Sequence, residues 1–278
     1  MSETSPLPPT FQFTQSKLQD YVDCPRRFQL RHVLMQPWPA LIVGSPDEME
    51  RQIERGADFH RLAHQYFLGL DPKLLEASIG DPVLLDWWQT FLEHPPAGLP
   101  DAVRASEIVR AVHLAGSRLL AKFDLLAAEP GRRLVIVDWK TGKRPPSRAA
   151  LARRMQTLVY RYLAVESGAG LTAGYEPQPE HIELVYWFAR SGGDTERFAY
   201  DADEHASTRT VLTGLIKEIV GRRGPIWPLT PDRRLCRFCQ YRSLCDRGVK
   251  PGFLEELEED LEPPEFEIEL EQIAEIEF

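Results

Sequence analysis

The two ends of this 278-residue chain carry cysteines that a single site would bring together. Cys24 stands alone near the start, and the other three follow near the end in the pattern Cys236-x2-Cys239-x5-Cys245. Thiolates are soft ligands that hold zinc or iron–sulfur clusters. A site shared by all four cysteines would close a loop of about 212 residues, and by analogy with long disulfide loops this closure stabilises a fold by roughly 4–5 kcal/mol. Such a site would bring the two ends of the chain into contact.

Reduced thiols are expected, because nothing in the chain predicts export or a membrane span. The segment Met1–Pro6 lacks the basic and apolar regions of a signal peptide, and the chain has no run of about 18 apolar residues. We therefore expect a cytoplasmic protein without a membrane partner, in which metal ligation is favoured over two disulfides. Four buried, unliganded thiols are the remaining alternative.

The hydrophobic pattern predicts a group of strands with helices before and after it. The turn signals Gly116-Ser117 and Pro130-Gly131 separate the first three strands. The order of helix, three strands, helix and strand predicts a mixed α/β (α+β) fold. A helical period is expected over 16–35, 48–67, 72–93, 147–166 and 203–221, and a strand pattern over 103–114, 117–127, 133–139, 181–189 and 195–200.

An apolar strand that ends in Asp138-Trp139-Lys140 is the strongest candidate for a catalytic element. Residues two apart on a strand share a face, so Asp138 and Lys140 lie on one surface and Trp139 on the other. A carboxylate suits Mg²⁺ or Mn²⁺, and a neighbouring ammonium group orients water or stabilises charge on a phosphoryl group. Asp124, on the preceding strand, offers a second carboxylate across the hairpin. A simple ion pair of Asp138 with Lys140 at the strand end is the alternative.

With these residues and this element order, the chain resembles the PD-(D/E)XK nuclease superfamily, specifically its RecB-like branch. The resemblance implies a restriction-endonuclease-like core, in which helices flank a mixed central sheet. It also implies that Asp124 and Asp138 are metal ligands for Mg²⁺ or Mn²⁺ and that Lys140 is the catalytic lysine. The branch has a histidine four residues after a glycine on the first core helix. Gly56 and His60 fit this spacing, which makes His60 the third metal ligand.

Another motif of this branch, Gln-x-x-x-Tyr, is present as Gln156 and Tyr160 on one face of the following helix. The resemblance implies that these two residues support the substrate or the site. Ala121 departs from the family, which often has a glycine three residues before the first aspartate, and this departure affects only the local backbone. Glu107 resembles an acidic position often seen on the first strand, and little catalytic importance is expected of it.

A zinc site at His60 and His64 is a weaker possibility, based on their His-x-x-x-His spacing. The glutamate of the zinc-protease motif is absent, because Arg61 follows His60. We therefore expect His64 to pack against its neighbours or to face solvent.

The same branch includes proteins that resemble AddB and the CRISPR-associated RecB-family exonucleases, which hold a four-iron–four-sulfur (4Fe–4S) cluster with one upstream and three C-terminal cysteines. The resemblance therefore implies an iron–sulfur cluster at Cys24, Cys236, Cys239 and Cys245. A tetrahedral Zn²⁺ site is the alternative, although common zinc patterns pair two short Cys-x2-Cys motifs. The predicted organisation is a disordered N-terminus (1–13), a nuclease domain (14–250) with a cysteine-clamped helical subdomain formed by 14–35 and 226–250, and an acidic tail (251–278).

The net charge of −9 comes from the tail, because residues 251–278 hold 12 of the 42 acidic residues and no lysine or arginine. The rest of the chain has 30 acidic and 33 basic residues. Arginines around the cysteines and after Lys140 would form a basic rim for phosphates, and ordinary solvated charge is the alternative. The tail is expected to be disordered; docking as an edge strand and competition with DNA for the basic rim are its other interpretations.

The expected protein is thus a metal-dependent deoxyribonuclease, with exonuclease action on single-stranded DNA or duplex ends favoured. The phosphate loop of a helicase motor, Gly-x4-Gly-Lys-Ser/Thr, is absent. A helicase or CRISPR adaptation proteins would therefore act in trans, in DNA repair, recombination or CRISPR adaptation. The alternatives are a non-catalytic nucleic-acid-binding or assembly module, and a zinc-stapled structural protein.

Overall fold

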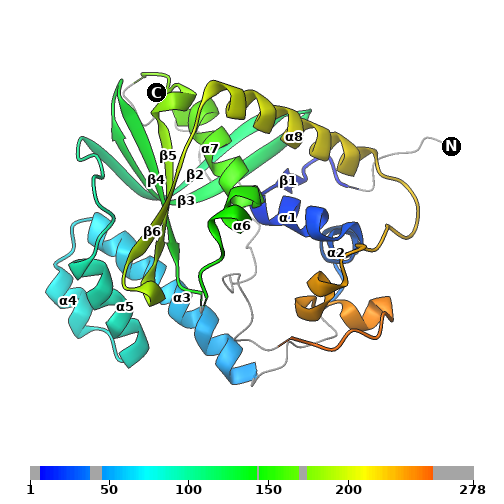
Figure 1. Cartoon of the computed structure of the whole chain (residues 1–278), viewed down its shortest axis with the longest axis horizontal. Helices are drawn as coiled ribbons and strands as arrows, with labels where there is room; N and C mark the ends of the chain where they lie inside the picture. Colours follow the sequence, from blue (N-terminus) through cyan, green and yellow to red (C-terminus); the bar gives the residue numbers. More distant parts are fainter. Residues whose placement is uncertain (1–6, 38–45, 143, 169–173, 253–278) are drawn as a thin grey trace.

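A mixed six-stranded sheet forms the centre of the protein (Figure 1). The computed structural model describes residues 7–37, 46–142, 144–168 and 174–252. The strands follow the order β1-β3-β4-β5-β6, and β2 pairs with β3 beside this path. The pairs β1–β3 and β4–β5 are parallel, and the other pairs are antiparallel. The strands are β1 (Gln12–Phe13), β2 (Val103–Leu114), β3 (Ser117–Glu129), β4 (Arg133–Lys140), β5 (Ile182–Phe188) and β6 (Asp194–Ala199).

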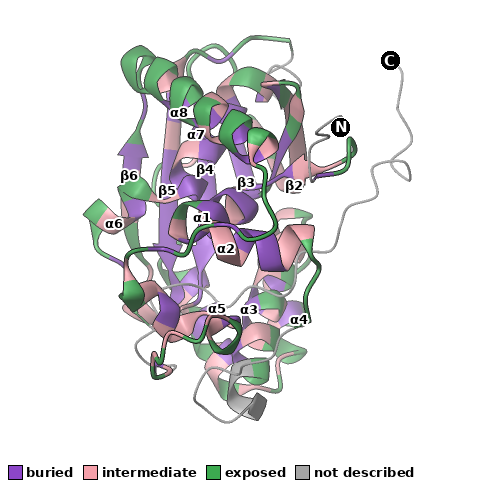
Figure 2. Cartoon of the chain, turned by 90° about the vertical axis from the view of Figure 1, so that its right-hand side faces the viewer, coloured by how far each residue is buried: buried purple, intermediate pink, exposed green. Residues whose placement is uncertain are grey.

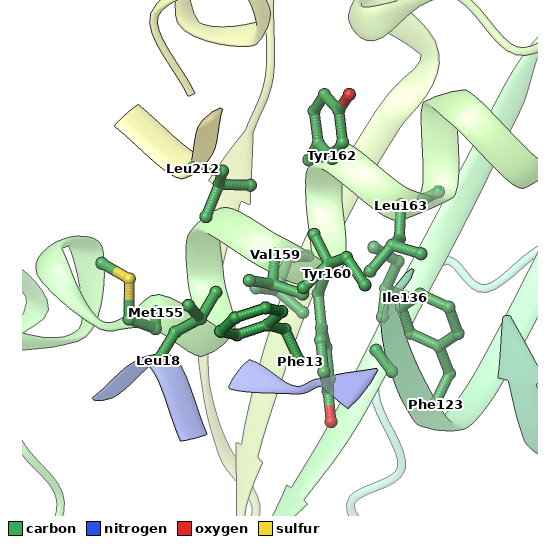
Figure 3. Packing of buried hydrophobic residues seen from close by; sticks show 14 of the residues in the cluster. Phe13, Leu18, Phe123, Ile136, Met155, Val159, Tyr160, Tyr162, Leu163 and Leu212 are labelled. Carbon is green, nitrogen blue, oxygen red and sulfur yellow. The ribbon is translucent and has the colours of Figure 1, made fainter. Parts of the chain in front are cut away.

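Helices cover both faces of this sheet, so the predicted mixed α/β core is confirmed. On one face, α1, α7 and α8 contribute Leu18, Val159 and Leu212 to a common apolar cluster (Figure 3). On the other face, α3, α4 and α5 form a second cluster that includes Phe59 and Trp87. The helices are α1 (Gln15–Asp23), α2 (Pro25–Phe28), the π-helix η1 (Gln29–Val33), α3 (Pro46–Phe67), α4 (Pro72–Ala77), α5 (Pro82–Glu93), α6 (Arg148–Arg153), α7 (Met155–Ser167) and α8 (Ala202–Gly221), with the 3₁₀-helices η3 (Pro179–His181), η4 (Ala189–Ser191), η5 (Arg233–Phe238) and η6 (Arg242–Cys245).

The two central strands, β4 and β5, are apolar on both faces because helices cover both. Val135 and Val137 of β4 belong to the cluster beneath α3 and α5, whereas Leu134 and Ile136 pack on the side of α7. Figure 2 shows the buried sheet and the exposed outer side of α8. Within the described ranges, no helix has both the length and the apolar character that crossing a membrane requires.

Three helical stretches of the sequence prediction are divided in the structure, and the first of them, 16–35, is divided at Cys24, whose backbone is extended. The predicted helix 72–93 is interrupted by Asp81, whose side chain accepts hydrogen bonds from the N–H groups of Val83 and Leu84 at 2.8 and 3.1 Å, and Pro82 then begins α5. The predicted helix 147–166 is interrupted at Arg154, whose extended backbone (ψ 142°) separates α6 from α7. The break at Arg154 allows α7 to begin at Met155.

The N-terminal residues differ from the predicted disorder of 1–13. Leu7 is buried, and β1 pairs in parallel with Arg118 and Leu119 of β3. Phe13 fits into the core between the sheet and α7 (Figure 3). The physical reason is that Phe13 buries its ring in the apolar cluster, which stabilises the segment. The polar, proline-containing composition of the segment gives no sign of this contact. Residues 1–6 and the tail from 253 lie outside the described residues.

The two ends of the described chain lie side by side, as the cysteine spacing predicts (Figure 1). The Arg26 N–H donates to the carbonyl of Pro228 at 3.0 Å. The Trp227 ring stacks on Phe28 with ring centroids 5.7 Å apart, and its backbone N–H donates to Gln29 Oε1 at 2.9 Å. The turn that holds Cys24 therefore packs directly against the C-terminal segment that holds the other three cysteines.

Candidate active site

Asp138 and Lys140 occupy the end of β4 and face α7, as the strand period predicts. Trp139 points to the opposite face, where it joins the cluster beneath α3 and α5. The Lys140 Nζ lies 2.8 Å from Asp138 Oδ2 and donates to Gln156 Oε1 at 2.9 Å. Gln156 Nε2 in turn donates to Asp138 Oδ1 at 2.7 Å. Three buried polar side chains from β4 and α7 thus form a closed ring of interactions.

Asp124 and Glu107 lie opposite one another at a shared irregularity of β3 and β2. The pairs Ser106↔Leu125 and Ile108↔Phe123 flank it, and no pair joins the two acidic residues. The side chains that face α7 are odd-numbered on β3 up to Phe123 and even-numbered from Leu126, and on β2 the same change separates Ala105 from Ile108. Each strand therefore accommodates one extra residue at this point. Glu107 adopts a left-handed backbone with φ 57°, which a glutamate adopts only at an energetic cost and which is typical of functional sites.

His60, Glu107 and Asp124 together form a group that can hold a metal ion. One ligand atom from each residue lies within 4.8 Å of the other two, and His60 Nδ1 is 3.2 Å from Asp124 Oδ1. The second Asp124 oxygen, Oδ2, accepts the backbone N–H of Trp139 at 2.8 Å. This hydrogen bond lies just beyond Leu125↔Val137, the last pair of the β3–β4 ladder. The Asp124 side chain therefore joins the two strands where they diverge.

The electrostatics of this group show that it favours positive charge. Burial alone would lower the pKa of His60, but the charge and hydrogen bond of Asp124, with further contributions from Asp138 and Glu107, raise it to about 9. Burial opposes ionisation of Asp124, yet the His60 charge, its hydrogen bond and the N–H of Trp139 together lower the pKa of that carboxyl. A divalent cation would replace the proton of His60 as the positive charge between the carboxylates.

Glu107, of which the sequence predicts little catalytic importance, lies in the metal-binding group. The Lys122 ammonium group pairs with Glu107 Oε2, and the Glu107 carboxylate lies with His60 and Asp124 in the metal-binding group. Asp138 lies outside that group, although its charge acts on His60. The available sequence signal is a lone glutamate on the strand directly opposite Asp124, and no local pattern reveals its positive φ.

Tyr160 and His64 form hydrogen bonds to residues of β3 and β2 near the site and do not belong to the metal-binding group. The Tyr160 hydroxyl donates to the carbonyl of Lys122 at 2.9 Å, which holds β3 two residues before Asp124. His64 Nδ1 lies within hydrogen-bond distance, 2.7 Å, of Ser106 Oγ. The metal-binding group contains His60 without His64, so the geometry favours the packing role expected for His64.

The residue that follows Lys140 is tied to α3 and to the segment after β5. The Thr141 carbonyl accepts hydrogen bonds from Gln52 Nε2 at 3.1 Å and from Arg190 Nε at 3.0 Å. Gly56, on the same helix as Gln52, lies so close that a Cβ atom there would be 3.1 Å from Thr141 Oγ1. His60 follows Gly56 by one helical turn. The contact with Thr141 therefore sets the distance between the His60 helix and the end of the Lys140 strand.

The four cysteines lie in the two segments that pack together. The Thr230 N–H donates to Cys24 Sγ at 3.4 Å, and Arg247 Nη1 donates to Cys236 Sγ at 3.6 Å. Burial raises the pKa of the Cys239 and Cys245 thiols, and the neighbouring Cys24 thiol adds to both increases. Among the described residues, three ligand atoms come within 4.8 Å of one another only in the His60 group.

The arginines of the predicted basic rim have separate local environments. Arg27 and Arg31 form ion pairs with the buried Asp20, and Arg148 pairs with Glu196 on β6. Three arginines of η5 and Arg247 line a separate open depression of about 380 Å³ in the surface of the cysteine segment. That depression is lined by Arg233, Arg234, Arg237, Arg247, Gly248 and Val249.

Comparison with known proteins identifies the family. Residues 12–246 match the family model of the PD-(D/E)XK nuclease superfamily, and the chain belongs to this superfamily. The search of curated proteins gives no match. Among solved structures, the chain is similar to one from Eubacterium rectale named "Putative exonuclease", with 10% identity, a TM-score of 0.45 and coverage of 88% of this chain and 91% of that chain. A crystal structure of SSO0001 is similar with 12% identity, a TM-score of 0.36 and coverage of 86% and 87%.

Proposed function

We propose that the protein is a deoxyribonuclease that depends on Mg²⁺ or Mn²⁺. The observation that carries the proposal is the metal-binding group of His60, Glu107 and Asp124 beside the buried Lys140 of β4. Carboxylate oxygens suit both ions, and an imidazole ligand favours Mn²⁺ over Mg²⁺. Asp138, whose charge acts on His60, is the further carboxylate that completes the metal site.

The bound ion would supply a polarised phosphoryl oxygen and a water of lowered pKa. The side chains around the ion would position the phosphate and the attacking water. Lys140 directs its ammonium group to the phosphate or to the attacking water, and Gln156 fixes that ammonium group and the Asp138 carboxylate with one amide. Tyr160 supports β3 through the carbonyl of Lys122.

We further propose exonuclease action on single-stranded DNA or duplex ends. The support for this finer activity is the resemblance to the RecB-like branch, together with the arginine-lined depression in the surface of the cysteine segment, which offers sequence-independent contacts to phosphates. DNA repair, recombination or CRISPR adaptation is the process this activity would serve. A helicase or CRISPR adaptation proteins would then supply the substrate in trans.

The cysteines are proposed to hold a 4Fe–4S cluster rather than Zn²⁺. The support for the cluster is the resemblance to the RecB-like branch, because thiolate ligands by themselves suit both zinc and iron–sulfur clusters. N–H donors to sulfur, such as those of Thr230 and Arg247, are a means by which proteins tune the potential of such a cluster. Anaerobic purification should yield a brown protein with iron; a colourless protein with stoichiometric zinc contradicts this assignment.

A cleavage assay on end-labelled single- and double-stranded DNA tests the proposed activity. We expect cleavage with Mn²⁺ or Mg²⁺, loss of cleavage with EDTA, and a decrease of at least about 100-fold in Lys140→Ala, as for other groups that act on developing charge. The matched control is Lys217→Ala on α8, which removes an ammonium group that lies outside the site. If Lys140→Ala cleaves as well as the wild type, the assigned site is wrong.

A further inference from the structure

Helix α7, which carries Gln156, lacks a side-chain cap of its own. Its N-cap residue, Arg154, makes no capping hydrogen bond. The first N–H of the helix, that of Met155, instead donates to Oε1 of Gln19 on α1 at 3.0 Å. A side-chain acceptor for the first N–H groups of a helix stabilises its beginning. The cap of α7 thus comes from a residue 136 positions earlier in the sequence.

The orientation of the Gln19 amide is set by the turn that contains Cys24. Gln19 Nε2 donates to Asp23 Oδ1 at 2.7 Å, and Asp23 Oδ2 accepts from Arg27 Nη2 at 2.6 Å. Because the amide nitrogen is used by the carboxylate, the amide oxygen faces Met155. Asp23 and Arg27 flank Cys24 in sequence, so this arrangement continues into the cysteine-bearing turn.

Gln156, the next residue of α7, contacts both Lys140 and Asp138 of β4. Gln156 bonds to Lys140 and Asp138 with its two amide atoms at 2.9 and 2.7 Å. Its backbone follows Met155 directly, so the position of the first turn of α7 determines where this amide lies. Loss of the cap would allow the first turn to fray, and Lys140 and Asp138 would lose a common partner.

We infer that Gln19 is a positioning residue, which connects the Cys24 turn to Lys140 and Asp138 by capping α7 ahead of Gln156. The expected effect of Gln19 on kcat rests on the proposed nuclease activity. The expected effect of Gln19 on the order of the first turn of α7 does not. Gln19 acts through Gln156 and contacts neither the metal-binding group nor the substrate.

A double-mutant cycle on Gln19 and Gln156 tests the connection. A cap contributes enough stability that its loss in Gln19→Ala should lower kcat about two- to thirtyfold, with little change of KM. The same change in a Gln156→Ala background should have less than a twofold effect, because the residue through which Gln19 acts is absent. The swapped pair Gln19→Glu/Asp23→Asn, which keeps an acceptor for the Met155 N–H and a donor–acceptor pair between the two side chains, should retain more activity than Gln19→Ala. An equal loss of kcat in both backgrounds overturns the inference.

Hydrogen exchange of the full-length protein separates this inference from the proposed function. Gln19→Ala should increase amide exchange in a peptide that covers the start of α7, whether or not the protein cleaves DNA. The matched control is Gln89→Ala on α5, which removes an amide that donates to Glu76 at an exposed site and should leave exchange at α7 unchanged. Unchanged exchange in Gln19→Ala overturns the inference. If Gln19→Ala shows the increased exchange but the wild type does not cleave DNA with Mn²⁺ or Mg²⁺, only the proposed activity is refuted.

Discussion

Replacement of Gly56 by alanine should weaken metal binding while the fold stays intact. The new Cβ would lie 3.1 Å from Thr141 Oγ1, whereas ordinary contacts are 3.4–4 Å. The helix that carries His60 must therefore move by a few tenths of an ångström relative to β4. Metal–ligand distances tolerate about 0.2 Å, and changes around metal ligands typically cost about 10–100-fold in affinity. We expect a loss of Mn²⁺ affinity in this range.

The stability of Gly56→Ala should change little, because two effects oppose each other. Alanine favours a helix over glycine by roughly 0.5–1 kcal/mol, and overpacking costs about 1–3 kcal/mol. The matched control is Gly214→Ala in α8, where nothing lies within 4 Å of the new Cβ. This control should raise the free energy of unfolding by about 0.5–1 kcal/mol and leave Mn²⁺ binding unchanged.

Titration calorimetry with Mn²⁺, together with thermal unfolding, measures both effects. The double variant Gly56→Ala/Thr141→Ala removes the crowded Oγ1 and should recover most of the lost affinity. The reasoning is refuted if Gly56→Ala binds Mn²⁺ as the wild type does, or if its loss of affinity persists without the Thr141 hydroxyl.

Three further predictions concern other parts of the chain. Glu107→Gln should weaken Mn²⁺ binding at least tenfold in calorimetry, in contrast to Glu196→Gln on β6, because only Glu107 belongs to the metal-binding group; equal binding by both variants contradicts the assignment. Arg27 and its neighbours overcome the effect of burial and lower the pKa of Asp20 to about 2, so the ionised group contributes stability above pH 4 that is lost as the pH falls through about 2. Asp20→Asn should therefore lower the free energy of unfolding by about 2 kcal/mol at pH 7, and this difference should shrink between pH 4 and pH 2 in denaturant titrations; a difference independent of pH argues against the ion-pair network. Deletion of residues 251–278 should increase DNA affinity at low salt if the acidic tail competes for arginines, and a filter-binding assay with no change would exclude that competition.

Part of this account follows from the sequence because it depends on local periodicity. The two-residue period of β4 places Asp138 and Lys140 on one face and Trp139 on the other, and the β3–β4 hairpin brings Asp124 near them. The spacing of Gly56 and His60 likewise places both residues on one helical face. These features require only the period of a strand or a helix.

The remaining features depend on contacts between distant residues. The left-handed backbone of Glu107 and the paired extra residues of β2 and β3 lie where the β3–β4 ladder ends, and the sequence of a single strand does not encode that geometry. Gln19 caps α7 across 136 positions, which no local pattern reveals. The break at Asp81-Pro82 differs from these cases, because an N-cap followed by proline is a local signal that the continuous helical period over 72–93 concealed.

The most direct test of the metal-dependent active site is anomalous diffraction from crystals of the protein grown with Mn²⁺. We predict one manganese peak within about 2.5 Å of ligand atoms from His60, Glu107 and Asp124, which is the range of metal–oxygen and metal–nitrogen bonds. A crystal that binds Mn²⁺ elsewhere while these three side chains remain without metal would contradict the account.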